Sequence, residues 1–245
     1  MAQRTFVITG ASGGIGSALV RRFLADGHAV VGLDLAEDGL ARLSGDLGHP
    51  AALSTYACDI TDEHAVEVVA EHLRGRGTGV DVLINCAGFF PPQPFEQIDF
   101  AAWRRVLSIN LDGVFLMTHA MLPLMKTRGA ARIINIGSSS FFQGTALYTH
   151  YVAAKAGVIG FTRSLSREVG KYGITCNVVA PGLTSTEIVK RTAPGTIIED
   201  RKQQRAIQRE QYADDLVGTI AFLCSAEAAF ITGQTINVDG GAVMH

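Results

Sequence analysis

The sequence predicts an α/β protein, a single-domain doubly wound Rossmann fold whose central parallel sheet is flanked by helices on both faces. Short runs rich in valine and isoleucine alternate with longer segments of helical periodicity, and a glycine-rich turn follows the first run. The 245 residues suffice for one domain with a full core, and no linker or internal repeat divides them. We therefore expect residues 1–245 to form one domain.

The apolar runs are the predicted strands, because strands of a parallel sheet are buried on both faces. They are residues 6–8, 29–31, 82–84, 132–136, 175–179 and 235–238. The amphipathic segments are the predicted helices: residues 14–26, 61–74, 100–125, 150–172 and 213–224. Parallel neighbours require crossover connections, and right-handed crossovers place these helices on both faces.

Charge and cysteine content limit the partners. A formal net charge of −2 offers no basic surplus for a phosphate backbone, so we expect no nucleic-acid partner. No run approaches the roughly 18 apolar residues of a membrane span, so no membrane partner is expected. The four cysteines are scattered without CxxC spacing, which predicts reduced thiols, no metal site and a cytoplasmic location.

The segment 186–212 interrupts the alternation, because it is polar and charged and contains a Pro-Gly pair. Long insertions in compact domains often cover binding sites, so we predict a substrate-binding lid here. The alternative is a solvated pair of surface helices.

The glycine-rich turn lies directly between the first predicted strand and the first predicted helix. Glycines there allow a tight turn and let backbone N–H groups approach a pyrophosphate at the helix N-terminus. This context predicts dinucleotide binding by Gly10, Ser12, Gly14, Ile15 and Gly16. The alternative is a purely structural turn.

Two acidic residues follow strand ends. Asp34 lies 18 residues after Gly16, near the spacing of a carboxylate that binds the adenosine ribose. It predicts NAD over NADP, since it would repel a 2′-phosphate and neither Gly13 nor Leu35 offers a cation; the alternative is a helix cap. Asp59 and Ile60 are placed to meet the adenine, although Asp59 could equally be the N-cap of the helix from Thr61.

Tyr151 and Lys155 are four positions apart on one predicted helix and therefore share a face. A neighbouring cation favours the phenolate, which predicts a lowered tyrosine pKa and a role in acid–base chemistry. Ser138, at the end of a predicted strand, could hold a substrate oxygen. His150 is adjacent to Tyr151, but adjacent helical residues point to different faces, so we do not predict it as a base.

Together these residues make the chain resemble the short-chain dehydrogenase/reductase family over essentially its whole length. The glycine-rich TGxxxGxG motif matches residues 9–16, and the NNAG motif matches Asn85-Cys86-Ala87-Gly88. The helix asparagine is Asn110, the serine is Ser138, and the YxxxK pair is Tyr151 and Lys155. The PG pair is Pro181 and Gly182, followed by Thr184 and Thr186. Cys86 departs from the usual asparagine, which puts one supporting hydrogen bond near the central strand in question.

The resemblance implies an oxidoreductase that moves a hydride between a secondary alcohol or ketone and a nicotinamide. It implies that Tyr151 transfers the proton, Lys155 lowers the tyrosine pKa and binds ribose, Ser138 orients the oxygen and Asn110 anchors a water. Further cofactor contacts are expected from Asn85, Ala87, Gly88, Tyr151, Lys155, Pro181, Gly182, Thr184 and Thr186. Relatives assemble as tetramers, so a homotetramer is expected.

Aromatic side chains follow two predicted strands and predict a hydrophobic or aromatic substrate. The predicted substrate pocket comprises Phe90, Ser138, Phe142, Gln143 and Tyr151; the alternative is that the phenylalanines fill core or subunit contacts. Parts of the chain are similar to bacterial NAD-dependent dehydrogenases of aryl secondary alcohols such as 1-phenylethanol, or of pyridoxal. Alternatives within the family are a 3-oxoacyl-thioester reductase or a sugar dehydrogenase, and outside enzymes a non-catalytic NAD(H)-sensing protein.

Overall fold

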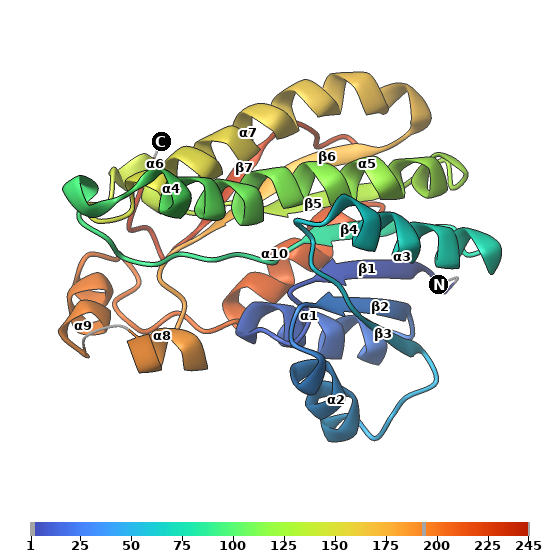
Figure 1. The fold of residues 1–245 in the computed structure, drawn as a ribbon, viewed down its shortest axis with the longest axis horizontal. Coiled ribbons are helices and arrows are strands. Elements are labelled where there is room, and N and C mark those ends of the chain that lie inside the picture. The colour runs from blue at the N-terminus through green and yellow to red at the C-terminus, as the bar shows by residue number, and fades with distance from the viewer. Residues whose placement is uncertain (1–2, 193–194, 245) are drawn as a thin grey trace.

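The computed structural model describes residues 3–192 and 195–244 and consists of one parallel sheet between two layers of helices (Figure 1). The strands are β1 (Thr5–Thr9), β2 (Ala29–Asp34), β3 (Leu53–Ala57), β4 (Val82–Asn85), β5 (Arg132–Ile136), β6 (Thr175–Pro181) and β7 (Thr235–Val238). The α-helices are α1 (Gly14–Ala25), α2 (Glu37–Asp46), α3 (Glu63–Gly75), α4 (Phe100–Leu107), α5 (Gly113–Lys126), α6 (Ser140–Gln143), α7 (Thr149–Val169), α8 (Glu187–Thr192), α9 (Gly195–Gln203) and α10 (Asp214–Cys224).

The sheet order is β3-β2-β1-β4-β5-β6-β7, and every neighbouring pair is parallel. The predicted doubly wound Rossmann fold is therefore confirmed. The order reverses between β1 and β4, where Val7 faces Leu83. In such sheets the carboxyl ends of the strands that flank the reversal open into the ligand crevice.

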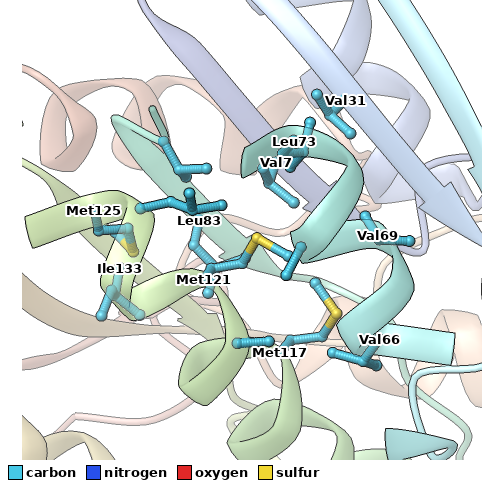
Figure 2. Packing of buried hydrophobic residues seen from close by; sticks show 14 of the residues in the cluster. Val7, Val31, Val66, Val69, Leu73, Leu83, Met117, Met121, Met125 and Ile133 are labelled. Carbon is cyan, nitrogen blue, oxygen red and sulfur yellow. The ribbon is translucent and has the colours of Figure 1, made fainter. Parts of the chain in front are cut away.

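The two faces of the sheet have separate cores because strand side chains alternate between them. Residues of α1, α2 and α10 pack on one face, and residues of α3, α5 and the end of α7 pack on the other. Figure 2 shows this second core, in which Met117, Met121 and Met125 of α5 lie among Val66, Val69 and Leu73 of α3 and strand residues that include Val7, Leu83 and Ile133.

The structure differs from the expectations for individual helices, and it adds the strand β3, which was not among the predicted runs. α2 was not predicted, because its charged residues and two glycines leave only Leu40 and Leu43 buried. The helix expected over 100–125 is interrupted by a π-helical turn at Ser108–Asp112. The N-cap role considered for Asp59 is wrong, since α3 begins later and Asp62 accepts the N–H groups of residues 64 and 65.

The continuous helical run Phe100–Lys126 is the one described helix long and apolar enough, by length and composition alone, to cross a membrane. Its inward side chains include Met117 and Met121, which are fully buried against α3 and the sheet (Figure 2). The apolar residues of this run therefore form part of the core.

Candidate active site

The glycine-rich turn between β1 and α1 is built so tightly that side chains are excluded. Gly10 has φ +66°, and a Cβ there would come within 2.8 Å of the Ala87 Cα. A Cβ on Gly16 would overlap the Gly10 carbonyl oxygen. The backbone thus turns sharply at the N-terminus of α1, which leaves N–H groups available to an anion, as a dinucleotide requires.

Thr9 fastens this turn to the loop after β4. Its Oγ1 accepts the backbone N–H groups of Cys86 at 3.0 Å and Ala87 at 3.1 Å. The two strand ends at the reversal point are therefore joined by a side chain of β1. The thiol of Cys86 is not a reactive thiolate, because burial raises its pKa to about 12.

Asp34, at the end of β2, points toward the glycine-rich turn. Its Oδ2 accepts hydrogen bonds from the Ser12 N–H at 3.0 Å and the Ser12 Oγ at 2.7 Å, and its Oδ1 accepts the Ala36 N–H at 3.1 Å. Ala36 rather than Asp34 is the N-cap position of α2. The carboxylate thus lies beside the predicted pyrophosphate site, which fits recognition of the adenosine ribose.

Asp59 and Ile60 follow β3 but differ in their surroundings. Asp59 Oδ1 accepts the Thr61 N–H at 2.9 Å and the Thr61 Oγ1 at 2.7 Å. Ile60 is buried, and a Cβ added to Gly113 would be 2.7 Å from its Cδ1. Ile60 therefore packs against the start of α5, and adenine contacts by the pair remain a prediction.

The loop after β6 lies against the glycine-rich turn from the other side. A Cβ on Gly14 would be 2.5 Å from the Thr186 Cγ2, so these two residues are in close contact. Thr184 is buried, with its Oγ1 donating to the Gly182 carbonyl at 3.1 Å. Gly182 donates its N–H to the Val238 carbonyl at 3.2 Å, which fixes Pro181 and Gly182 beside β7.

Tyr151 and Lys155 lie on α7, as their spacing predicts, but their electrostatics differ from the prediction. Lys155 Nζ is 5.6 Å from the centroid of the Tyr151 ring and donates to the Ile136 carbonyl at 2.8 Å. Burial raises the pKa of Tyr151 to about 12, against the effect of its hydrogen bond with Ser138. Burial also lowers the pKa of Lys155 to about 8. With this pKa the tyrosine is a neutral acid near pH 7, which differs from the expected lowering of its pKa by Lys155.

Ser138 lies between Tyr151 and a second serine, Ser140, which no sequence motif marks. Ser138 Oγ lies 2.7 Å from Ser140 Oγ and accepts the Ser140 N–H at 3.2 Å. Ser138 is also hydrogen-bonded to Tyr151. Ser138, Tyr151 and Lys155 therefore form one group at the end of β5, as predicted.

Asn110 lies in the π-helical turn and is fully buried. Its Nδ2 donates to the Phe89 carbonyl at 2.7 Å and the Val106 carbonyl at 2.9 Å, and its Oδ1 accepts the Phe89 N–H at 3.3 Å. Both amide hydrogens are thus used to hold the loop after β4, beside Gly88. The water relay implied for Asn110 remains a prediction.

Asn85 is turned into the core rather than toward solvent. Its Nδ2 donates to Asn135 Oδ1 at 2.8 Å and to Thr118 Oγ1 at 3.1 Å, and Asn135 continues the chain to Thr162 Oγ1 at 2.8 Å. These buried amides and hydroxyls tie β4 and β5 to α5 and α7. The Asn85 side chain therefore supports the strands that carry the site, and its predicted cofactor contact remains untested.

The predicted substrate residues fall into different places. The Phe90 ring lies 5.9 Å from the Tyr151 ring, beside the group that Ser138, Tyr151 and Lys155 form. Phe142 packs against a core cluster that includes Val158 and Val178, which favours the core role considered for it. Gln143, the last residue of α6, receives a hydrogen bond from Arg201 at 3.1 Å.

Within residues 186–212 the structure has two short helices, α8 and α9, which lie together at one end of the molecule (Figure 1). This agrees with the helical pair considered for the segment. α9 contacts the predicted substrate region through Arg201 and Gln143, so the helices are not merely a solvated pair. Burial lowers the pKa of Arg205, which follows α9 and donates to the Leu183 carbonyl at 2.7 Å.

Several site residues carried no signal in the sequence. Ser140 is one of three consecutive serines, and Arg201 lies in a run of charges that resembles any exposed helix. Gln211 donates its Nε2 to the Val238 carbonyl at 2.6 Å and pairs through the backbone with Thr184. Only the folded chain brings these residues to the site.

Comparison with known proteins assigns the chain to a family. The family model described as Enoyl-(Acyl carrier protein) reductase matches residues 10–243. The chain is 36% identical over 242 residues, 97% of its length and 96% of the relative, to the 3-oxoacyl-(acyl-carrier-protein) reductase FabG of Salmonella typhimurium. It is 37% identical over 243 residues, 98% of its length and 96% of the relative, to the cis-4-hydroxycyclohexanecarboxylate dehydrogenase of Sinomonas cyclohexanicum.

A solved structure gives the same result for the whole fold. The glucose/ribitol dehydrogenase-type protein of Brucella melitensis, described as a short-chain dehydrogenase/reductase, superimposes with a TM-score of 0.92 at 34% identity and covers 99% of this chain and 97% of its own. With the glycine-rich turn and the Ser138–Tyr151–Lys155 group in place, the chain belongs to the short-chain dehydrogenase/reductase family of oxidoreductases.

Proposed function

We propose that the protein is an NAD-dependent dehydrogenase that interconverts a secondary alcohol and its ketone on a hydrophobic, ring-bearing substrate. The observation that carries this proposal is the group formed by Ser138, Tyr151 and Lys155, with the Phe90 ring 5.9 Å from the tyrosine ring. An alcohol held between the two hydroxyls would have its oxygen at an acid–base residue and its carbon beside an aromatic wall.

The residues at the strand ends fit a nicotinamide dinucleotide. A Cβ at Gly10 or Gly16 would collide with backbone, so the turn is shaped for close approach of a ligand. Gly10, Gly14, Ile15 and Gly16 would hold the pyrophosphate, beside Ser12, whose N–H and hydroxyl both donate to Asp34. Lys155 would hold the ribose, and Thr184 and Thr186 the carboxamide. When bound, the cofactor supplies the hydride acceptor or donor.

The chain's own residues handle the proton and the oxygen. Tyr151 is protonated near neutral pH, because its pKa is about 12, and so can donate to a ketone oxygen in the reductive direction. Ser138 orients that oxygen. Lys155, with a pKa of about 8, is mostly charged at pH 7, and its Nζ keeps hydrogens free beyond the one given to Ile136.

NAD is the proposed cofactor because Asp34 carries a negative charge beside Ser12, at the edge of the glycine-rich turn. A 2′-phosphate brought to this point would meet like charge, whereas ribose hydroxyls can donate to the carboxylate. We further propose a cytoplasmic homotetramer in which residues 186–212 act as a substrate lid.

A ring-bearing alcohol is favoured by Phe90 and by the similarity to the Sinomonas cyclohexanicum dehydrogenase, whose name specifies a hydroxylated cyclohexane ring. The second candidate is reduction of a 3-oxoacyl thioester, favoured by the 36% identity to the Salmonella reductase. Reaction at Tyr151 would be common to both, so only the substrate separates them.

A single panel tests the proposal. The purified protein is assayed for NAD and NADP reduction with 1-phenylethanol, cyclohexanols, sugars and 3-hydroxyacyl thioesters, with Tyr151→Phe as the control. We expect turnover of ring alcohols with NAD, and loss of nearly all turnover in the variant with NAD affinity retained. Binding of NAD without turnover of any substrate would instead indicate an NAD(H)-sensing protein.

A further inference from the structure

Arg201 of α9 reaches back to the segment that carries Ser138. Its Nη1 donates to Gln143 Oε1 at 3.1 Å and to Gln204 Oε1 at 2.9 Å. Gln143 is the last residue of α6, a helix that begins two residues after Ser138. The guanidinium is therefore held between the lid segment and the substrate end of β5 by two neutral amide oxygens.

This cation has no counterion within residues 3–192 and 195–244. Its neighbour Lys202 pairs with Glu199 at 3.2 Å, and Arg209 pairs with Asp215. Arg201 forms no such ion pair in that part of the chain, and Arg205, four positions further along the chain, adds further positive charge. A partly buried guanidinium whose partners are all neutral attracts an anion, because charge-assisted hydrogen bonds are stronger than those to amides.

The charge of Arg201 also acts on Tyr148: burial raises the pKa of Tyr148, and the guanidinium acts in the opposite direction. The Tyr148 ring is 6.3 Å from the Tyr151 ring. Tyr148, on which the Arg201 charge acts, therefore lies beside the acid–base residue.

We infer that Arg201 binds an anionic group carried by the substrate, a carboxylate or a phosphate, at the end remote from the reacting hydroxyl. The inference rests on the proposed function, since it places the alcohol at Tyr151. The planar guanidinium can form two parallel hydrogen bonds with a carboxylate or phosphate and can exchange the Gln143 oxygen for it. The substrate class is then a hydroxy acid with the two groups separated by a ring, or an acyl thioester of phosphopantetheine.

The first test compares charged and neutral substrates. The kcat/KM values of 4-hydroxycyclohexanecarboxylate and of its methyl ester are measured for the wild type, Arg201→Gln and the matched control Lys202→Gln. A second arm compares 3-hydroxyacyl phosphopantetheine with the shorter thioester that lacks the phosphate. We expect the ratio of charged to neutral kcat/KM to fall about tenfold or more in Arg201→Gln, mainly through KM, and to stay unchanged in Lys202→Gln.

The arm in which the ratio falls identifies the anion as carboxylate or phosphate. An unchanged ratio in both arms, or an equal fall in Lys202→Gln, would overturn the inference. Binding of unreactive cyclohexanecarboxylate and of phosphopantetheine, measured by calorimetry, requires no turnover. If the affinity for either anion drops in Arg201→Gln while no alcohol is oxidised, the anion site stands and the proposed function fails. If neutral alcohols are oxidised but Arg201→Gln binds both anions as tightly as the wild type, the proposed function stands and the anion site fails.

Discussion

Ser138 and Ser140 place their hydroxyl oxygens 2.7 Å apart, and the Ser140 N–H donates to the same Ser138 oxygen at 3.2 Å. A serine oxygen has one hydrogen and two lone pairs. If Ser140 fills both lone pairs of Ser138, the Ser138 hydrogen is left for the Tyr151 oxygen, with which Ser138 is also hydrogen-bonded. Ser140 is thus a positioning residue for Ser138.

We expect Ser140→Ala to lower kcat about tenfold, because Ser138 loses one restraint on its hydroxyl. The KM for NAD should not change, and Ser140→Thr should restore activity, since threonine keeps the hydroxyl. Steady-state kinetics of both variants, with the neighbouring Ser139→Ala as control, measure this. Equal activity of Ser140→Ala and Ser140→Thr would rule the role out.

The lowered pKa of Lys155 predicts that the free energy of unfolding depends on pH. Its pKa is about 8 in the folded protein against 10.5 for an ordinary lysine, so the unfolded chain binds more protons between these values. Stability contributed by this group therefore rises as pH increases through that window, and its burial is most unfavourable below pH 8.

In Lys155→Met we expect a free energy of unfolding at pH 7 at least equal to that of the wild type. The difference between the free energies of unfolding, variant minus wild type, should fall by up to about 3 kcal/mol as pH rises toward 10.5. Urea unfolding of both proteins across this range measures the two free energies of unfolding. The cysteines and tyrosines titrate in both proteins, so their contributions cancel in the difference. A difference independent of pH would contradict the assignment.

Gly10 and Gly27 offer a matched pair, since both have positive φ, +66° and +83°, but only Gly10 has a close neighbour. Gly27→Ala should cost about 1 kcal/mol from backbone strain and leave NAD binding unchanged. Gly10→Ala adds a collision with the Ala87 backbone, so we expect a loss of about 3 kcal/mol and of NAD binding. Thermal unfolding and a binding titration separate the two effects. Similar behaviour of both variants would show that the close approach is unimportant.

Asp34 should control the choice between the two cofactors. We expect Asp34→Ala to lower kcat/KM for NAD about tenfold and to raise it for NADP, because the repulsion of the 2′-phosphate is removed. Ser12→Ala, which removes one of the three hydrogen bonds to this carboxylate, should have a smaller effect in the same direction. Measurements of kcat/KM with NAD and with NADP for the wild type and both variants test this role of Asp34. A wild type that prefers NADP would refute it.

The strands and the glycine-rich turn could be predicted because both follow local rules: buried parallel strands have continuous apolar runs, and tight turns need glycine. Tyr151 and Lys155 could be placed together because helical spacing fixes their relative position. The pKa of Tyr151 could not be predicted, because it depends on burial by segments that are distant in the sequence. Arg201 was equally invisible, because its contact with Gln143 spans 58 positions.

The π-helical turn at Ser108–Asp112 inserts an extra residue into a helix that otherwise runs from residue 100 to 126. The helical phase after the turn is therefore shifted by roughly 100° from the phase before it, so no single amphipathic stripe describes the whole run. Regularising this helix by a one-residue deletion would restore a continuous stripe, but it would rotate Asn110 away from the Phe89 backbone. The π-helical turn is therefore needed to place Asn110, and an idealised redesign of the scaffold would have to retain it.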